Sequence, residues 1–147
     1  DPVLGHWYHY FWHKDEAEYY GTSSPDTIWQ DVVNQSEAFW PTVKKHIEQI
    51  LAEGKPAIFD GVGLLPHLMQ QLPIKGVVVI AASEQQILDR LKAEPRWSDK
   101  EELQRMEAHA FFTIEAPNYI KQAEKYGYPL FNDPVAAEAK LLRLIEG

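Results

Sequence analysis

Three short apolar runs interrupt the helical patterns of the chain beyond residue 55. The run Val77–Ala82 is continuous rather than alternating, which is typical of a strand buried on both faces of a parallel sheet. The runs Ala57–Asp60 and Pro129–Asn132 begin with apolar residues and end in polar ones. The pattern therefore predicts three strands, at 57–60, 77–82 and 129–132.

Apolar residues at helical spacing fill most of the remaining chain. The serine, proline and aspartate at 24–26 form a helix start, since each suits a position at the amino end of a helix. The spacing predicts a helix from there to about Phe39, where Pro41 ends it, kinks it or starts another. A further helical pattern follows and closes at Gly54.

Later helices carry their own start signals. Ser83 precedes a helix and has Gln86 three residues later, as in a capping box. Ser98 precedes a long helix that reaches Pro117, and a second helical piece continues to 125. The last helix starts at 133–134, where aspartate is followed by proline.

The elements alternate in the order helix, strand, helix, strand, helices, strand and helix. Alternation of this kind favours right-handed crossovers and a parallel sheet with helices on both faces. The sequence therefore predicts an α/β fold, a three-layer sandwich, built as one domain over 1–147. Residues 1–54 would be its helical part, and 55–147 would carry the core strands and the final helix.

The composition is that of a globular protein, with 45% hydrophobic and 24% charged residues among 147. The absence of cysteine excludes disulfides, thiolate metal sites and cysteine nucleophiles. A net charge of −8 argues against a nucleic-acid partner. The longest apolar run is far shorter than a membrane span, and the first residues do not resemble a signal peptide. We expect a cytoplasmic protein with no membrane partner.

Aromatic residues concentrate near the start of the chain, and more than half of them lie in the first 40 positions. They predict either a packed helical core or a platform on which a flat ligand stacks. His6, His9 and His13 would share one helix face, where three imidazoles could bind zinc. Packing, or hydrogen bonding to an anionic substrate, is the favoured interpretation, because aromatic residues crowd this face.

Asp60 is the main candidate for chemistry. A carboxylate at the carboxyl end of a parallel strand faces the crevice where open α/β sheets bind ligands. It could hold a magnesium-bound water or accept a proton from a substrate hydroxyl. The alternative is a loop aspartate that caps the helix after it. Gly61 and Gly63 would either allow a substrate to approach the backbone or serve as turn residues.

Four stretches, taken in order, resemble the P-loop kinase family, in the branch of nucleoside monophosphate kinases and of shikimate- and gluconate-kinase-like proteins. They are Gly54–Gly61 (GKPAIFDG), Val77–Ser83 (VVVIAAS), Ile87–Arg96 (ILDRLKAEPR) and Tyr126–Asp133 (YGYPLFND). The resemblance covers about residues 40–147. It implies a strand ending in an acidic residue, a core strand, a helix leading to an arginine-bearing lid, and a last strand whose loop passes the adenine.

The resemblance implies an ATP-dependent phosphotransferase with Mg²⁺ and a small-molecule or nucleotide acceptor. Asp60, Arg96 and Arg90 would be catalytic, Asp60 would also face the metal, and Arg105 would bind substrate. Guanidinium groups suit this role because phosphoryl transfer spreads negative charge over oxygens. The alternative for Arg90 and Arg105 is ordinary pairing with acids four residues away on a helix.

The resemblance assigns further contacts at both ends of the chain. Trp12 and His13 would contact the acceptor, since the helical segment 1–54 would form or precede the substrate-binding region. Asn132 and Asp133 would lie beside the nucleotide. The competing hypothesis is a non-catalytic binding or regulatory module that does not bind nucleotide.

The strongest motif of that family, Gly-x-x-x-x-Gly-Lys-Ser/Thr, is absent from the chain. The predicted sheet would then lack a strand between 57–60 and 77–82. We therefore expect an N-terminal segment with this strand and loop ahead of Asp1, which makes the domain incomplete at its N-terminus. A degenerate relative or another α/β fold are the alternatives. The chain itself is predicted to bind ATP weakly or not at all.

Overall fold

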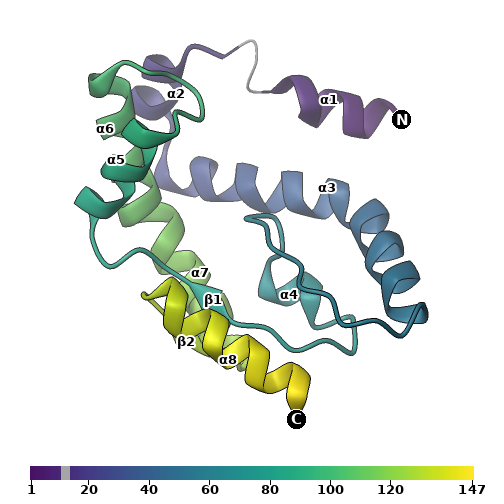
Figure 1. The fold of residues 1–147 in the computed structure, drawn as a ribbon. Coiled ribbons are helices and arrows are strands. Elements are labelled where there is room, and N and C mark those ends of the chain that lie inside the picture. Colours follow the sequence, from purple (N-terminus) through teal and green to yellow (C-terminus); the bar gives the residue numbers. More distant parts are fainter. Residues whose placement is uncertain (11–13) are drawn as a thin grey trace.

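The computed structural model describes residues 1–10 and 14–147 (Figure 1). The chain runs in the order α1 (Pro2–Tyr10), α2 (Glu16–Thr22), α3 (Pro25–Ala52), α4 (Pro66–Met69), β1 (Val78–Val79), α5 (Glu84–Ala93), α6 (Glu101–Ala110), the π-helix η1 (Phe111–Glu115), α7 (Ala116–Tyr126), β2 (Leu130–Phe131) and α8 (Pro134–Glu146).

The predicted three-layer α/β sandwich is wrong, because the described part of the chain is mainly helical. Its sheet consists of β1 and β2, which pair in parallel with Val78 opposite Leu130 and Val79 opposite Phe131. The segment 57–60 forms no strand, and the Ile58 side chain there is 54% exposed. An apolar run forms a fully buried strand only where it lies in a sheet whose two faces are both covered. The described residues do not form such a covered sheet around the three apolar runs.

Helix α3 is the longest element and has 28 residues. The Ser24 hydroxyl caps it by accepting a hydrogen bond from the Thr27 backbone N–H at 3.1 Å. Pro41 lies inside α3, where it has no N–H to offer the carbonyl of Glu37. Figure 1 shows α3 changing direction about midway. Of the three outcomes predicted for Pro41, the structure shows a kink.

Two of the three later start signals are confirmed by hydrogen bonds, at Ser83 and Asp133, whereas α6 begins after Lys100 and has no side-chain cap from Ser98. The Ser83 hydroxyl accepts from the Gln86 N–H, and the Asp133 carboxylate accepts from the Val135 N–H. Gly127 ends α7 with a φ of 75°, a left-handed conformation that favours glycine. Local capping chemistry was therefore readable from the sequence even though the architecture was not.

The interior holds two clusters of buried apolar side chains. The larger one joins α3, α4 and α7 through Trp40, Ile47, Leu65, Leu68, Leu72 and Tyr119. The second joins α5 and α6 through Ile87, Leu88, Leu91 and Ala108. Helices α6, η1 and α7 follow one another as a continuous helical rod (Figure 1), which spans the distance between the two clusters.

A buried carboxylate fastens the first two helices to α3. Asp31 of α3 accepts hydrogen bonds from the Tyr10 hydroxyl at 3.0 Å and from the Tyr19 hydroxyl at 2.8 Å. Trp40 of α3 donates its indole N–H to Gln71 at 2.9 Å. These contacts place several of the early aromatic residues in the packing between helices.

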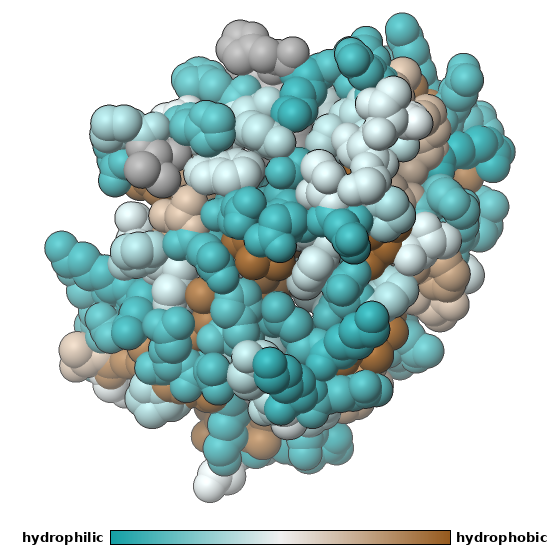
Figure 2. Space-filling view, turned by 180° about the vertical axis from the view of Figure 1, so that it is seen from behind, coloured by the Kyte–Doolittle hydropathy of each residue, from teal (hydrophilic) through white to brown (hydrophobic). Residues whose placement is uncertain are grey.

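The outer surface is largely polar on the face drawn in Figure 2, with apolar side chains showing between the polar ones. Exposed large apolar residues include Ile58, Val62, Val135 and Leu142. Within 1–10 and 14–147, none of the helices has the length and apolar character needed to cross a membrane.

Candidate functional site

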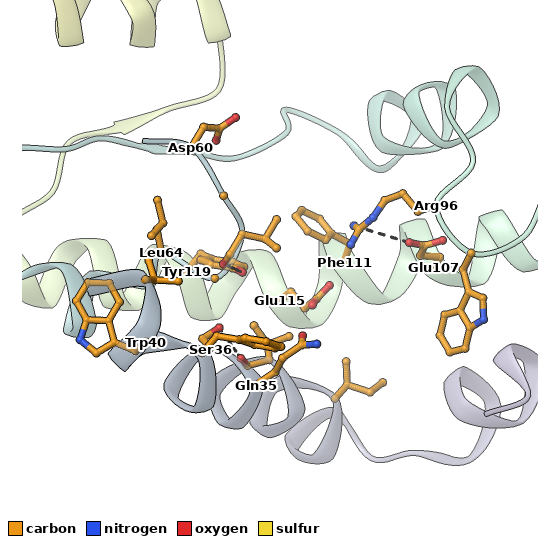
Figure 3. Close-up of a pocket in the computed structure, with 18 of the residues that line it drawn as sticks. Gln35, Ser36, Trp40, Asp60, Leu64, Arg96, Glu107, Phe111, Glu115 and Tyr119 are labelled. Carbon is orange, nitrogen blue, oxygen red and sulfur yellow. Dashed lines mark hydrogen bonds and ion pairs between the residues drawn. The ribbon is translucent and has the colours of Figure 1, made fainter. Parts of the chain in front are cut away.

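A cavity of about 840 Å³ lies between α3 on one side and the rod α6–η1–α7 on the other (Figure 3). Its volume is within the range of small-molecule binding sites. The residues that line it are Tyr19, Tyr20, Ile28, Val32, Gln35, Ser36, Phe39, Trp40, Val43, Asp60, Gly61, Val62, Gly63, Leu64, Arg96, Trp97, Glu107, Phe111, Glu115 and Tyr119.

Aromatic rings form much of the cavity wall. Tyr119 of α7 is packed edge-on against Trp29 of α3, with ring centroids 5.2 Å apart. Its hydroxyl donates a hydrogen bond to the Val62 carbonyl at 2.7 Å, which fixes the loop 60–64 to α7. At the other end, Trp97 lies against Tyr19 and Tyr20 of α2. The walls can therefore hold a flat apolar body from several sides.

Arg96 forms an ion pair within the cavity. Its guanidinium Nη1 lies 3.8 Å from Oε1 of Glu107, whose side chain is only 8% exposed (Figure 3). The second Glu107 oxygen, Oε2, is buried and has no hydrogen-bond partner among residues 1–10 and 14–147. Burial raises the pKa of Glu107, and the positive charge of Arg96 partly opposes that shift. The pair is positioned by α6 and by the loop after α5.

Glu115 is the second acid on this wall and belongs to η1. Burial raises the pKa of Glu115 to about 7; the charge of Arg96 acts against this shift, and that of Glu107 adds to it. The structure gives Glu115 no hydrogen bond or ion pair with any residue that it describes. Its carboxyl group is therefore available to a ligand and is close to half protonated near neutral pH.

A third acid, Glu16 of α2, is buried but is not among the described residues that line the cavity. Only 5% of its surface is exposed, and neither carboxylate oxygen has a hydrogen-bond partner in the described part of the chain. Burial raises the pKa of Glu16, with smaller contributions from the charges of Glu107 and Asp15. Tyr20 lies in the same environment, and burial raises the pKa of its hydroxyl as well.

The structure brings four of the sequence-predicted residues to one place. Asp60, Gly61 and Gly63 line the cavity from the loop after the extended segment 57–60, and Arg96 lines it from the loop after α5. The Arg96 side chain is 59% exposed, so it is also reachable from solvent. Their chemical roles remain predictions.

The other predicted residues that the structure describes do not line this cavity. Arg90 lies exposed on α5, and Arg105 pairs with Glu101 one turn earlier on α6, the ordinary pairing considered as its alternative. Asn132 and Asp133 are exposed after β2, and the Asp133 carboxylate caps α8. The predicted acceptor contacts Trp12 and His13 lie outside the described residues.

Sequence reasoning missed the two glutamates of the cavity. Leu103, Glu107, Phe111, Glu115 and Tyr119 follow one another at intervals of four, so they form one stripe along the helical rod. Acidic residues on an otherwise apolar stripe are a signal of enclosed carboxyl groups, because ionised side chains are rarely buried unless paired. The resemblance to P-loop kinases favoured the arginines instead.

The residues present do not fit ATP or a resident magnesium ion. The chain has no glycine-rich phosphate-binding loop, and the predicted nucleotide contacts Asn132 and Asp133 are away from the cavity. In the part of the chain that the structure describes, no three His, Asp or Glu side chains are grouped to hold a metal. Asp60 therefore lines the cavity without belonging to a metal-binding group among the described residues.

No protein-family model, curated protein or solved structure matches this chain. The resemblance to P-loop kinases is therefore wrong: no comparison supports it, and the described residues form a mainly helical fold with one pair of two-residue strands. The four stretches that suggested it have local patterns that occur here in a different architecture. What the chain does has to be argued from its cavity.

Proposed function

We propose that the cavity binds a small hydroxyl-bearing molecule and is the acceptor site of a phosphotransferase. One observation carries the proposal: Asp60 and Arg96, from two separate loops, line the same cavity. A carboxylate can accept the proton of an attacking hydroxyl. A guanidinium can stabilise the negative charge that develops on a transferred phosphoryl group.

The remaining lining would position the acceptor. Aromatic side chains such as Trp40 and Tyr119 offer faces for an apolar or ring-shaped body. Gln35 and Ser36 of α3 supply neutral hydrogen-bonding groups on the same lining. The proposal concerns the acceptor half of the reaction, since the described residues form no site for the phosphoryl donor.

A second candidate is a binding module without catalysis. It is favoured by the pairing of Arg96 with Glu107, which already offsets the one guanidinium of the cavity lining. In such a module Asp60 would be a hydrogen-bond acceptor for the ligand and would move no proton. The two candidates share the cavity and differ in what Asp60 does.

Calorimetric titration with pairs of hydroxylated compounds and their deoxy analogues tests the proposal. Asp60→Asn should reduce the preference for the hydroxylated member, and Arg96→Ala should weaken binding of its phosphorylated product. Asp99→Asn and Arg143→Ala, on exposed positions away from the cavity, are the matched controls. A hydroxyl preference that survives Asp60→Asn would contradict the acceptor-site proposal.

A further inference from the structure

The cavity has more carboxyl groups than cationic groups. Asp60, Glu107 and Glu115 line it, and Arg96 is the one lysine or arginine among its lining residues in the described part of the chain. Arg96 is already within ion-pair distance of Glu107. Glu115 is left with no positive partner at that distance among the described residues. A ligand that brings a positive charge would supply one.

The surroundings of Glu115 suit an organic cation. Phe111 and Tyr119, one turn to either side of it, have ring centroids 6.5 Å apart. Figure 3 shows the Glu115 carboxyl group in the middle of the drawn cavity, between Phe111 and Tyr119 along the rod. An ammonium group is attracted both by a carboxylate and by the faces of aromatic rings. A hydrated anion would find neither contact favourable.

A π-helical turn of the backbone positions Glu115 at the cavity. The Ala116 N–H bonds to the Phe111 carbonyl five residues earlier, which is the wide turn of a π-helix. Such turns are rare and frequently lie at functional sites. This one lies where the helical rod passes the cavity, and both of its end residues, Phe111 and Glu115, line the cavity.

We infer that Glu115 is the counter-ion for a protonated amine on the ligand. The inference deepens the proposed function and rests on it for the hydroxyl group: the acceptor is then an amino alcohol with an apolar or aromatic body. Glu115 binds the ammonium group of the ligand, the aromatic side chains of the cavity contact its apolar or aromatic part, and Asp60 interacts with its hydroxyl group.

Affinity for such a ligand depends on the ionisation of Glu115. The titratable or charged groups that act on Glu115 or are influenced by it are Arg96, Glu107 on α6, Tyr20 on α2 and Tyr119 on α7. Because burial raises the pKa of Glu115 to about 7, its carboxyl group is mostly neutral at pH 6 and mostly ionised at pH 8. Binding of an ammonium group should strengthen over this interval, by about tenfold.

The test is calorimetric titration of the whole chain with phenethylamine and with its neutral counterpart, phenethyl alcohol. The wild-type chain should bind the amine at least about tenfold more tightly at pH 8, and this preference should shrink at pH 6. Glu115→Gln should abolish both the preference and its pH dependence. Glu124→Gln, on an exposed position of α7, should change neither.

Equal binding of the two probes at pH 8, or an amine preference that survives Glu115→Gln, would overturn the inference. If Glu115→Gln does not fold, Glu115→Asp keeps the charge and should retain the preference for the amine; loss of that preference in a folded Glu115→Asp variant would count against the inference. Different results would contradict the inference and the proposed function. An amine preference that depends on Glu115, with no role for Asp60 in hydroxyl preference, would leave this subsite standing and remove the acceptor site.

Discussion

Glu16, Glu107 and Glu115 are three carboxyl groups whose pKa is raised by burial. In each case the folded chain holds a proton more tightly than the unfolded chain does. Their stabilising effect is therefore fully present below the ordinary glutamate pKa and is lost as pH rises through the folded-state pKa. For Glu115 that window runs from 4.5 to about 7.

We therefore expect the free energy of unfolding to decrease between about pH 5 and pH 8, with about 2 kcal/mol of the decrease coming from Glu115. Urea unfolding followed by tryptophan fluorescence measures it. Glu115→Gln should be flatter across this range than the wild-type chain. A stability that increases with pH over the interval would show that the carboxyl groups are not enclosed as described.

Asp31 offers a second test at the level of one side chain. It accepts hydrogen bonds from the hydroxyls of Tyr10 and Tyr19, and it is buried. Asp31→Asn removes the charge from both bonds, so the free energy of unfolding should fall by about 1–3 kcal/mol. Asp99→Asn on an exposed loop should change it by less than about 0.5 kcal/mol. Equal effects of the two substitutions would mean that Asp31 does not fasten α1 and α2 to α3.

Two glycines give opposite predictions at the scale of the helix. Gly127 ends α7 with a φ of 75°, and a side chain there would meet no atom within 4 Å. Gly127→Ala should destabilise the chain by about 1 kcal/mol through backbone strain alone. Gly5 lies inside α1 with equally open space, so Gly5→Ala should stabilise it by about 0.5–1 kcal/mol. Thermal unfolding of both variants compares the two signs directly.

Helix ends were predictable because their chemistry is local. The caps at Ser24, Ser83 and Asp133 need only a side chain and the next turn of backbone. The absence of a strand at 57–60 could not be predicted in this way. Apolar residues there indicated a buried strand. A strand forms only if another segment of the chain pairs with it, and such long-range pairing cannot be inferred from a short stretch of sequence.

The site was partly predictable for a related reason. Asp60 was chosen because it ends an apolar run, and its loop does reach the cavity. Arg96, Arg90 and Arg105 were chosen from the resemblance to the arginine-bearing lid of P-loop kinases; Arg96 lines the cavity, whereas Arg90 and Arg105 lie outside it. Glu107 and Glu115 were missed because enclosure depends on how α3 packs along the helical rod, which the resemblance to another fold concealed.

At the scale of the whole molecule, the sequence contains no Gly-x-x-x-x-Gly-Lys-Ser/Thr motif. We expect calorimetry with ATP and magnesium to show no low-micromolar binding to the 147-residue chain. The carboxyl-rich cavity adds to this expectation, because uncompensated negative charges repel a triphosphate. Tight binding would mean that a triphosphate can be held without the glycine-rich loop, and both the cavity charge argument and the acceptor-site proposal would need revision.

The π-helix η1 between α6 and α7 depends on one additional residue, which one codon of the gene encodes. A wide turn of this kind contains one residue more than a regular α-helical turn. Deleting Thr113, which is exposed within η1, would let the rod close into an ordinary helix. Because the wide turn holds one residue more than a regular turn, closing it without that residue would leave the residues beyond it at nearly the same angle about the helix axis. Tyr119 would therefore stay on the stripe that starts at Leu103, and the loss of that codon would remove the wide turn while the cavity kept this wall.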